Sequence, residues 1–240
     1  MTTQAMTRHA MTRQVQMKQF RGFVAATGFA VALAASAGVG IAAAPPETAS
    51  CAGCHGANGM GNAAANFPAL AGLHAGYLNQ QLYAFKHGSR ANAMMNAMAA
   101  ALTAATRSKI AAYYASLPVT PMAEPNPAPG GLGAQIAMQG LNTGTTNAVP
   151  ACASCHGTGG LGQGRFPRLA GQPQAYLAAQ LVAWQKGTRG ETPTHLMRHI
   201  ARKLSPADIT AVAAYYAALS PNPAPGAPAA STKASAKTPG

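Results

Sequence analysis

Two copies of one short cysteine motif constrain this chain more than any other feature. The motif C-x-x-C-H occupies residues 51–55 and occurs again at residues 152–156. Two thiols with this spacing can attach to the two vinyl groups of one haem, and the adjacent histidine can bind the iron. We therefore expect the chain to fold around two covalently bound haem c groups. The residues that would attach and ligate them are Cys51, Cys54 and His55 at the first haem and Cys152, Cys155 and His156 at the second.

Paired cysteines have two other common uses, a redox disulfide and one half of a zinc site. No β-α-β pattern surrounds either pair, and a histidine follows both, which argues against a redox disulfide. Each pair also has its own copy of the same flanking sequence, which indicates two self-sufficient units rather than one shared zinc site. Haem attachment uses all 4 cysteines and leaves none for a structural disulfide.

The chain is strongly basic. It has 17 Lys and Arg against 4 Asp and Glu, for a formal net charge of +13, and residues 130–220 are more basic than residues 45–124. The basic residues are scattered and no nucleic-acid-binding motif is present, so nucleic acid is not an expected partner. A basic surface could steer docking to acidic patches on a partner or to an anionic membrane, or it could serve solubility alone.

Residues 1–44 have the composition of a targeting segment. A polar, basic stretch over residues 1–21 precedes an uncharged run rich in Ala, Val and Gly over residues 22–44. This order is typical of a secretory signal peptide, and the run is also long enough to cross a bilayer as an uncleaved anchor. We therefore expect a signal peptide or an N-terminal membrane anchor, with the haem region in the periplasm.

The remaining chain is an internal repeat. The sequences F-P-x-L-A-G, Y-L-x-x-Q-L and Y-Y-A follow the cysteine motif in the same order in both copies. A unit of this size is marginal on its own apolar core, and a buried haem would supply much of what is missing. The expected domains are residues 45–120 and 130–220, joined by a proline-rich linker at 121–129 and followed by a disordered Pro, Ala and Lys tail at 221–240.

Apolar periodicity predicts helices in both repeats. In the first repeat we expect a helix over residues 75–87 and a last helix over residues 104–117 with Thr103 as its N-cap. Between them lies a methionine-rich segment, residues 94–98, to which no secondary structure is assigned.

The start of the last helix in the second repeat has stronger signals. Ser205 can cap it, Pro206 suits its first turn, and Asp208 lies three residues after the cap. A further helix is expected over residues 132–141, before the second cysteine motif. Nothing equivalent precedes the first motif, so the first domain is expected to lack most of an N-terminal helix unless part of the apolar run over residues 22–44 supplies it.

The second axial ligand decides whether each iron carries electrons or performs chemistry. Met197 is the only methionine between the second haem motif and the last helix, eight residues before Ser205. The same offset in the first repeat selects Met95, although Met94 and Met98 compete with it. A methionine thioether raises the reduction potential of a haem, whereas core filling is the ordinary alternative role of methionine.

Several other polar side chains are candidates for roles near the haems. His195 and His199 flank Met197 at helical spacing and could bind metal or replace it, but we expect them, like His74 and His87, to be ordinary surface histidines. Arg90 and Arg189 occupy matching positions in the two repeats. They could pair with haem propionates through charge-assisted hydrogen bonds, or they could be solvated surface arginines.

The order C-x-x-C-H, F-P-x-L-A-G, Y-L-x-x-Q-L, G-x-R, Met, L-[ST], Y-Y-A, present twice, resembles the dihaem cytochrome c4 family over residues 46–219. The resemblance implies an all-α protein of two tandem class I cytochrome c domains, related by a pseudo-twofold axis and each wrapped around its haem. It also implies haems that face one another, with propionates near the contact between domains. The implied iron ligands are His55 and Met95 at the first haem and His156 and Met197 at the second.

The resemblance further implies an electron-transfer protein rather than an enzyme. Such a protein carries single electrons in the periplasm from a quinol-oxidising complex or a dehydrogenase to a terminal oxidase, so membrane respiratory complexes are the expected partners. One alternative is a dihaem electron-transfer subunit of a periplasmic dehydrogenase. The other is a dihaem oxidoreductase with one open iron site, against which the paired methionines argue.

Overall fold

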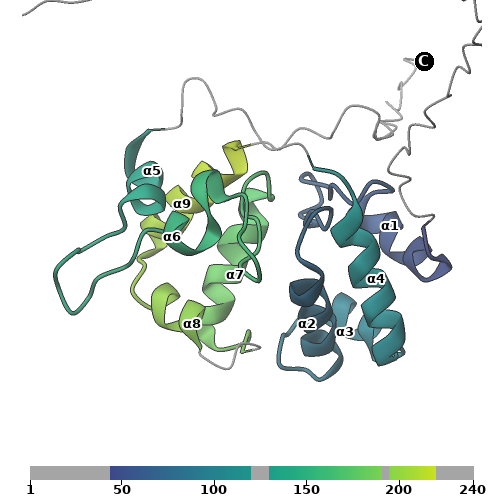
Figure 1. The fold of residues 1–240 in the computed structure, drawn as a ribbon. Coiled ribbons are helices and arrows are strands. Elements are labelled where there is room, and N and C mark those ends of the chain that lie inside the picture. The colour runs from purple at the N-terminus through teal and green to yellow at the C-terminus, as the bar shows by residue number, and fades with distance from the viewer. Residues whose placement is uncertain (1–43, 120–129, 191–194, 220–240) are drawn as a thin grey trace, which may run out of the picture. The chain divides into compact units, whose positions relative to one another are not determined.

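The computed structural model describes residues 44–119, 130–190 and 195–219. Within these ranges the chain forms helices and isolated β-bridges but no strand (Figure 1). The expected all-α fold is therefore confirmed. The linker and tail expected from the sequence, and all but the last residue of the expected targeting segment, lie outside the described residues. No helix in the described part of the chain combines the length and apolar character needed to cross a membrane.

The first half, residues 44–119, packs its helices around the first core. Its elements are η1 (Pro46–Thr48), α1 (Ala49–His55), α2 (Ala75–Lys86), α3 (Ala93–Ala100) and α4 (Ala104–Ser116). Helix α2 contacts both α3 and α4. Helix α4 begins as predicted, because Thr103 Oγ1 accepts the backbone N–H of Thr106 at 3.1 Å. Tyr114 of α4, 1% exposed, is the largest fully buried side chain of this core.

The second half, residues 130–219, repeats this arrangement around a second core. Its elements are α5 (Gly131–Met138), α6 (Ala153–His156), η2 (Thr158–Gly160), α7 (Gln174–Lys186), α8 (Leu196–Ala201) and α9 (Pro206–Ala218). Helix α7 contacts α8 and α9 as α2 contacts α3 and α4. The predicted start of α9 is a complete capping box, in which Ser205 accepts the N–H of Asp208 while the Asp208 carboxylate accepts the N–H of Ser205.

The two halves differ at their starts, as the sequence predicts. The expected helix over residues 132–141 is α5, which ends three residues earlier than predicted and packs on α9. Gly133 allows this contact, because a Cβ there would collide with the Ala211 carbonyl. The described part of the first half has no such helix. There η1 contacts α4, and Glu47 and Lys109 form an ion pair at 3.8 Å that is largely exposed and contributes little stability.

Among the short helices that were not predicted, α3 and α8 carry the candidate methionines. The methionine-rich segment forms α3, which Asn92 caps by accepting the N–H of Met95 at 2.9 Å. Helix α8 carries Met197 and begins after His195, whose backbone is in the left-handed region at φ 49°. Both helices are too short for an apolar period to appear in the sequence, and both bring methionine beside the helix that precedes them.

Candidate haem sites

Each cysteine motif ends in a buried histidine whose ring orientation is fixed. His55 Nδ1 lies 2.8 Å from the Pro68 carbonyl oxygen, and His156 Nδ1 lies 2.7 Å from that of Pro167. A carbonyl oxygen only accepts, so Nδ1 carries the hydrogen and Nε2 keeps its lone pair for a metal. Burial lowers the pKa of both imidazoles more than the carbonyl contact raises it, which favours the neutral form that can bind iron.

A tight loop after each motif holds the histidine in place. The Gly61 N–H donates to the His55 carbonyl at 2.8 Å, and the Gly162 N–H donates to the His156 carbonyl at 2.7 Å. Gly61 has φ +79°, and a Cβ there would lie 2.6 Å from the Phe67 carbonyl oxygen. Only glycine fits this position without strain, so the loop that orients the histidine depends on it.

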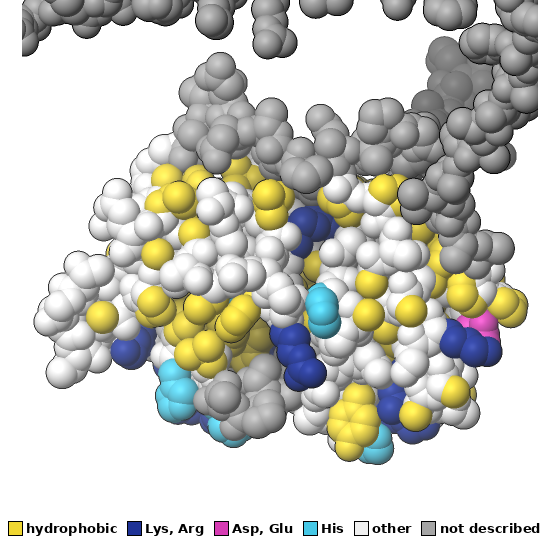
Figure 2. Space-filling view, in the orientation of Figure 1, with side chains coloured by type: hydrophobic (Ala, Val, Ile, Leu, Met, Phe, Trp, Pro, Cys, Tyr) yellow, Lys and Arg dark blue, Asp and Glu magenta, His cyan; other side chains and the backbone are white. Residues whose placement is uncertain are grey.

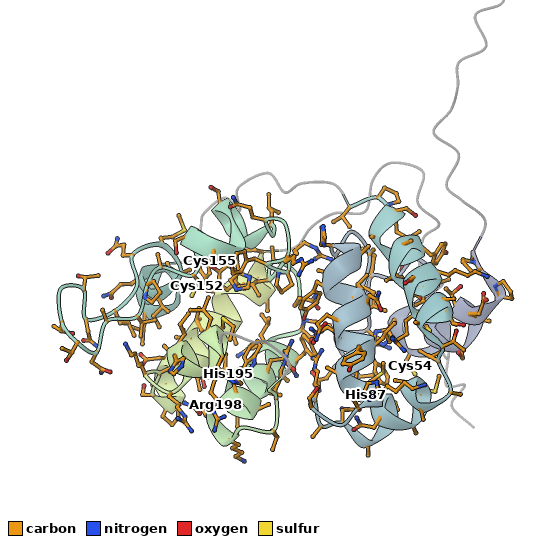
Figure 3. The ribbon with its side chains drawn as sticks, turned by 60° about the horizontal axis from the view of Figure 1, so that its bottom comes forward. Cys54, His87, Cys152, Cys155, His195 and Arg198 are labelled. Carbon is orange, nitrogen blue, oxygen red and sulfur yellow. The ribbon has the colours of Figure 1, made fainter. Side chains whose placement is uncertain are left out.

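The four cysteines form no disulfide with one another and are partly buried. Figure 3 shows Cys152 and Cys155 next to one another in the second half and Cys54 in the first. Burial raises the pKa of the Cys51 thiol and raises that of Cys152 to about 11. A reactive redox cysteine needs a thiolate, which burial disfavours at Cys51 and Cys152. The described residues also contain no cluster of three or more His, Cys, Asp or Glu that could hold a metal ion.

Each histidine shares a hollow with its two cysteines and with methionine. The first hollow is lined by the first cysteine motif and by Met94, Met95 and Met98 of α3. The second is lined by the second motif and by Met197 of α8. Met95 is half-buried, whereas Met94 is 54% and Met98 41% exposed. The structure thus brings the predicted residues together at both sites, and burial favours Met95 over its two neighbours.

The remaining walls of both hollows suit the two chemical parts of a haem, which are an apolar macrocycle and two propionate carboxylates. The apolar walls include Leu78, Leu82, Phe85 and Ile110 in the first half and Leu177, Leu181, Ile200 and Val212 in the second. Arginine contributes the basic part, Arg90 and Arg189 at the first hollow and Arg168 and Arg189 at the second. Two buried polar atoms near the second hollow have no partner among the described residues, Arg168 Nε and Trp184 Nε1. The residues present therefore fit a haem in each half.

Arg90 and Arg189 are only 6% and 2% exposed, so the surface alternative for them is wrong. Arg90 donates to Gln81 of its own half at 2.6 Å and to Gln180 of the other half at 2.7 Å. Arg189 mirrors this pattern, with Gln180 at 2.7 Å and Gln81 at 3.0 Å. Each guanidinium also reaches a tyrosine hydroxyl of the opposite half, and each lies over an aromatic ring of its own half.

The backbone repeats the same symmetry between the halves. The Ala91 N–H donates to the Thr188 carbonyl at 2.9 Å, and the Gly190 N–H donates to the Ser89 carbonyl at 2.9 Å. Because each of these arginine and backbone contacts has its counterpart with the halves exchanged, the two halves are related by the expected pseudo-twofold symmetry. The arginines at its centre line the haem hollows, so the interface and the haem sites share residues.

The other histidines within the described ranges lie on the surface. His195, directly before α8, and His199 on α8 are exposed, and Figure 3 shows His195 near Arg198. His74 is exposed and caps α2 by accepting the Gly76 N–H at 3.1 Å. His87 is exposed and lies against the Tyr83 ring at 4.1 Å. Figure 2 shows hydrophobic side chains gathered over α7 and α8, with histidine and basic side chains at the edge of this patch.

Sequence reasoning missed the residues that join the halves. Gln81 and Gln180, like Tyr77 and Tyr176, are polar and occupy equivalent positions in the two repeats. The repetition of these polar residues in both halves could have indicated that they make a buried contact. Arg168, which donates to the Ala71 carbonyl of the first half at 3.1 Å, gave no such signal, because the equivalent position in the first repeat is alanine.

Comparison with known proteins places both halves in one family. The cytochrome c family model matches residues 43–118 and 142–220. A thiosulfate dehydrogenase electron acceptor from Thiomonas intermedia (strain K12) is 46% identical over 182 residues, covering 74% of this chain and 82% of that protein. Much of the chain thus aligns with a protein that accepts electrons.

Two solved structures show the same fold. Reduced recombinant cytochrome c4 from Pseudomonas stutzeri has a TM-score of 0.61 and 34% identity, covering 72% of this chain and 95% of that one. The thiosulfate dehydrogenase TsdBA from Marichromatium purpuratum, in its as-isolated form, also has a TM-score of 0.61, with 40% identity. That match covers 70% of this chain but only 36% of the other chain, so this chain spans about a third of that enzyme's length.

Proposed function

Because this chain belongs to the cytochrome c family, as a dihaem member similar to cytochrome c4, we propose that it accepts single electrons from a thiosulfate dehydrogenase and passes them towards a terminal oxidase. It carries two covalently bound haem c groups and transfers electrons rather than catalysing a reaction. A redox partner on each side follows from that role. The thiosulfate dehydrogenase as donor and the terminal oxidase as the final acceptor are the two partners that we propose.

One observation carries the choice of donor. A relative named as the electron acceptor of thiosulfate dehydrogenase is 46% identical to this chain, compared with 34% for the cytochrome c4 structure. In addition, this chain aligns with part of a chain that is itself named thiosulfate dehydrogenase, TsdBA. An acceptor of this kind combines both roles considered from the sequence, a carrier and the electron-transfer partner of a dehydrogenase.

The residues that we propose attach the haems and bind their irons are those that line the two hollows. The first haem is attached by Cys51 and Cys54, and the second by Cys152 and Cys155. The bound haem supplies a one-electron couple at its iron. Nε2 of His55 and of His156 would bind the irons, and Met95 and Met197 would each supply a second, soft ligand. With a histidine and a methionine bound, neither iron would be open to a substrate, as expected of an electron carrier.

The same proposal includes domain limits and location. We assign the first domain to residues 45–120 and the second to residues 130–220, with 121–129 as linker and 221–240 as tail. The family match over residues 43–118 and 142–220 supports this division. The basic and then apolar order of residues 1–44 supports export to the periplasm, where the segment is either cleaved or kept as an anchor.

Reduction kinetics test the choice of donor. The oxidised dihaem protein is mixed under anaerobic conditions with a thiosulfate dehydrogenase and thiosulfate, and haem reduction is followed by absorption. We expect two electrons to enter each chain, at a rate that rises with dehydrogenase concentration. Samples lacking either the enzyme or thiosulfate provide the controls. If the dehydrogenase does not accelerate reduction while a quinol-oxidising complex does, the donor is the quinol-oxidising complex instead.

A further inference from the structure

The helix that carries Met95 is weakly fastened by apolar packing. Of the eight residues of α3, only Ala99 is buried. An alanine side chain removes little apolar surface from water, so its burial does little to hold the helix in place. The equivalent helix of the second half, α8, also packs Ile200 against the core, whereas the first half has Met98 at that position, 41% exposed. Contacts within the protein that hold α3 therefore have to be polar.

Asn96, the residue after Met95, makes three hydrogen bonds with its side chain. Its Nδ2 donates to the Phe85 carbonyl at 2.5 Å and to the Arg90 carbonyl at 3.0 Å. Its Oδ1 accepts the N–H of Asn92 at 2.7 Å. The carbonyl oxygens only accept and the N–H only donates, so one orientation of the amide satisfies all three partners. Asn96 thereby ties α3 to the last turn of α2 and to the loop between the two helices.

The two carbonyl groups belong to residues that are themselves buried and held. Phe85 is 8% and Arg90 6% exposed, and the Arg90 guanidinium lies 4.5 Å from the centre of the Phe85 ring. The Arg90 N–H donates to the Ala84 carbonyl at 3.2 Å, and the Arg90 side chain donates to Gln180 of the second half at 2.7 Å. Asn96 therefore fastens a weakly packed helix to a well-anchored support.

The contacts of Asn96 fix the backbone of Met95. Asn92, whose N–H Asn96 accepts, in turn accepts the Met95 N–H with its own side chain at 2.9 Å. The Met95 backbone thus lies between two residues that hold one another. Met95 lines the first hollow, whereas Asn96 does not. Any effect of Asn96 on a haem in that hollow therefore passes through Met95.

We propose that Asn96 positions Met95 for the iron of the first haem and keeps that iron closed to external ligands. A ligand held in its bound position loses less entropy when it binds, so it leaves less often. Without the amide, α3 can separate from α2 and the thioether dissociates more readily. The proposal rests on the methionine ligation in the proposed function and is independent of the electron donor.

The second haem provides an internal control for this role. Arg198 follows Met197 as Asn96 follows Met95, but an arginine side chain has no acceptor atom and cannot combine two donors with an acceptor. A change at Asn96 should therefore alter the ligation of the first haem alone.

Cyanide binding to the ferric holoprotein tests the proposal, because cyanide binds the iron only after methionine has left. The rate is followed by stopped-flow absorption, and the proton NMR signals of the haem methyl groups identify which haem has bound cyanide. In Asn96→Ala we expect the first haem to bind cyanide about tenfold faster than in the wild type, with the second haem unchanged. Asn79→Ala is the matched control, since it removes an exposed amide that donates to Ser108 Oγ at 3.3 Å, and should change neither rate.

Asn96→Asp separates the donors of the amide from its acceptor. The carboxylate can still accept the Asn92 N–H, but it cannot donate to the two carbonyl oxygens, so cyanide should again bind faster to the first haem. If N96A does not retain both haems, N96D decides alone. Lower stability to denaturant with an unchanged cyanide rate would show that Asn96 only supports the fold, and would overturn the proposal. A wild-type protein without the NMR signal of a coordinated methionine at the first haem would instead contradict the ligand set itself.

Discussion

At the scale of single residues, the three methionines of the first haem site are not equivalent. Met95 is half-buried and lines the first hollow, while Met94 and Met98 line it from more exposed positions. The second site offers Met197 alone, so only the first site poses a choice of ligand. A ligand must be held against the iron, and burial is the feature that distinguishes Met95.

Replacement of each methionine tests that choice. Met95→Ala should abolish the sulfur-to-iron absorption band of the first ferric haem and lower its reduction potential, because a soft ligand that favours ferrous iron is lost. Met94→Ala is the matched control and should leave both unchanged. The assignment is wrong if M95A keeps the band while M94A or M98A loses it.

A second residue-scale prediction concerns the loop that holds His55. In Gly61→Ala the new Cβ would lie 2.6 Å from the Phe67 carbonyl oxygen at a φ of +79°. We expect the free energy of unfolding to fall by about 3 kcal/mol from backbone strain and the collision together. Gly88→Ala is the control, since Gly88 has a similar φ of +74° and nothing within 4 Å.

Denaturant unfolding of the holoprotein measures both variants. The strain common to both glycines should cost G88A about 1 kcal/mol. Equal losses in G61A and G88A would mean that the close approach to Phe67 adds nothing.

At the scale of elements, the helix starts were predictable because capping is local. Thr103 and Ser205 lie next to the helices that they cap, and their signals are readable within four residues of sequence. Helices α3 and α8 escaped prediction because each is only about two turns long and is held by the helix beside it. The short first half was also foreseen, since no helical period precedes its cysteine motif within residues 45–50.

The capping box of α9 gives an element-scale prediction. Ser205→Ala removes the acceptor of the Asp208 N–H, which lies 3.2 Å from Ser205 Oγ, and should lower the stability of the second half by about 1 kcal/mol. Thr210→Ala removes only an exposed hydroxyl contact within α9 and serves as control. Denaturant unfolding followed by far-ultraviolet circular dichroism compares them. A loss in T210A as large as that in S205A would show that the cap has no special role.

At the scale of the whole molecule, the halves meet through contacts that no local pattern could reveal. Arg189 and Gln81 are 108 positions apart, and their hydrogen bond depends on how two separate cores are placed. The haem motifs were predictable because each is contiguous in sequence. The sharing of arginines between the interface and the haem hollows was not, and Arg168 lacked even a repeated partner to suggest it.

Charge is also distributed unequally across the molecule, which leads to a prediction about docking. Exposed or half-exposed basic residues gather at the end of α7 and along α8, namely Lys186, Arg198, Arg202 and Lys203. If a partner docks there through acidic groups, its electron exchange with this protein should slow as ionic strength rises. Arg202→Glu should slow the exchange about tenfold at low salt, whereas Lys109→Glu in the first half should have little effect. Rates that do not respond to salt would exclude this docking mode.

The account as a whole depends on both irons being closed by a histidine and a methionine, and absorption spectroscopy with carbon monoxide tests this most directly. The purified protein is recorded oxidised, then reduced, and then reduced with the gas added. Two low-spin haems per chain, a sulfur-to-iron band in the ferric protein and no change with carbon monoxide are the predicted results. A haem that binds the gas readily would have an open iron, and the chain would then be an oxidoreductase rather than a carrier.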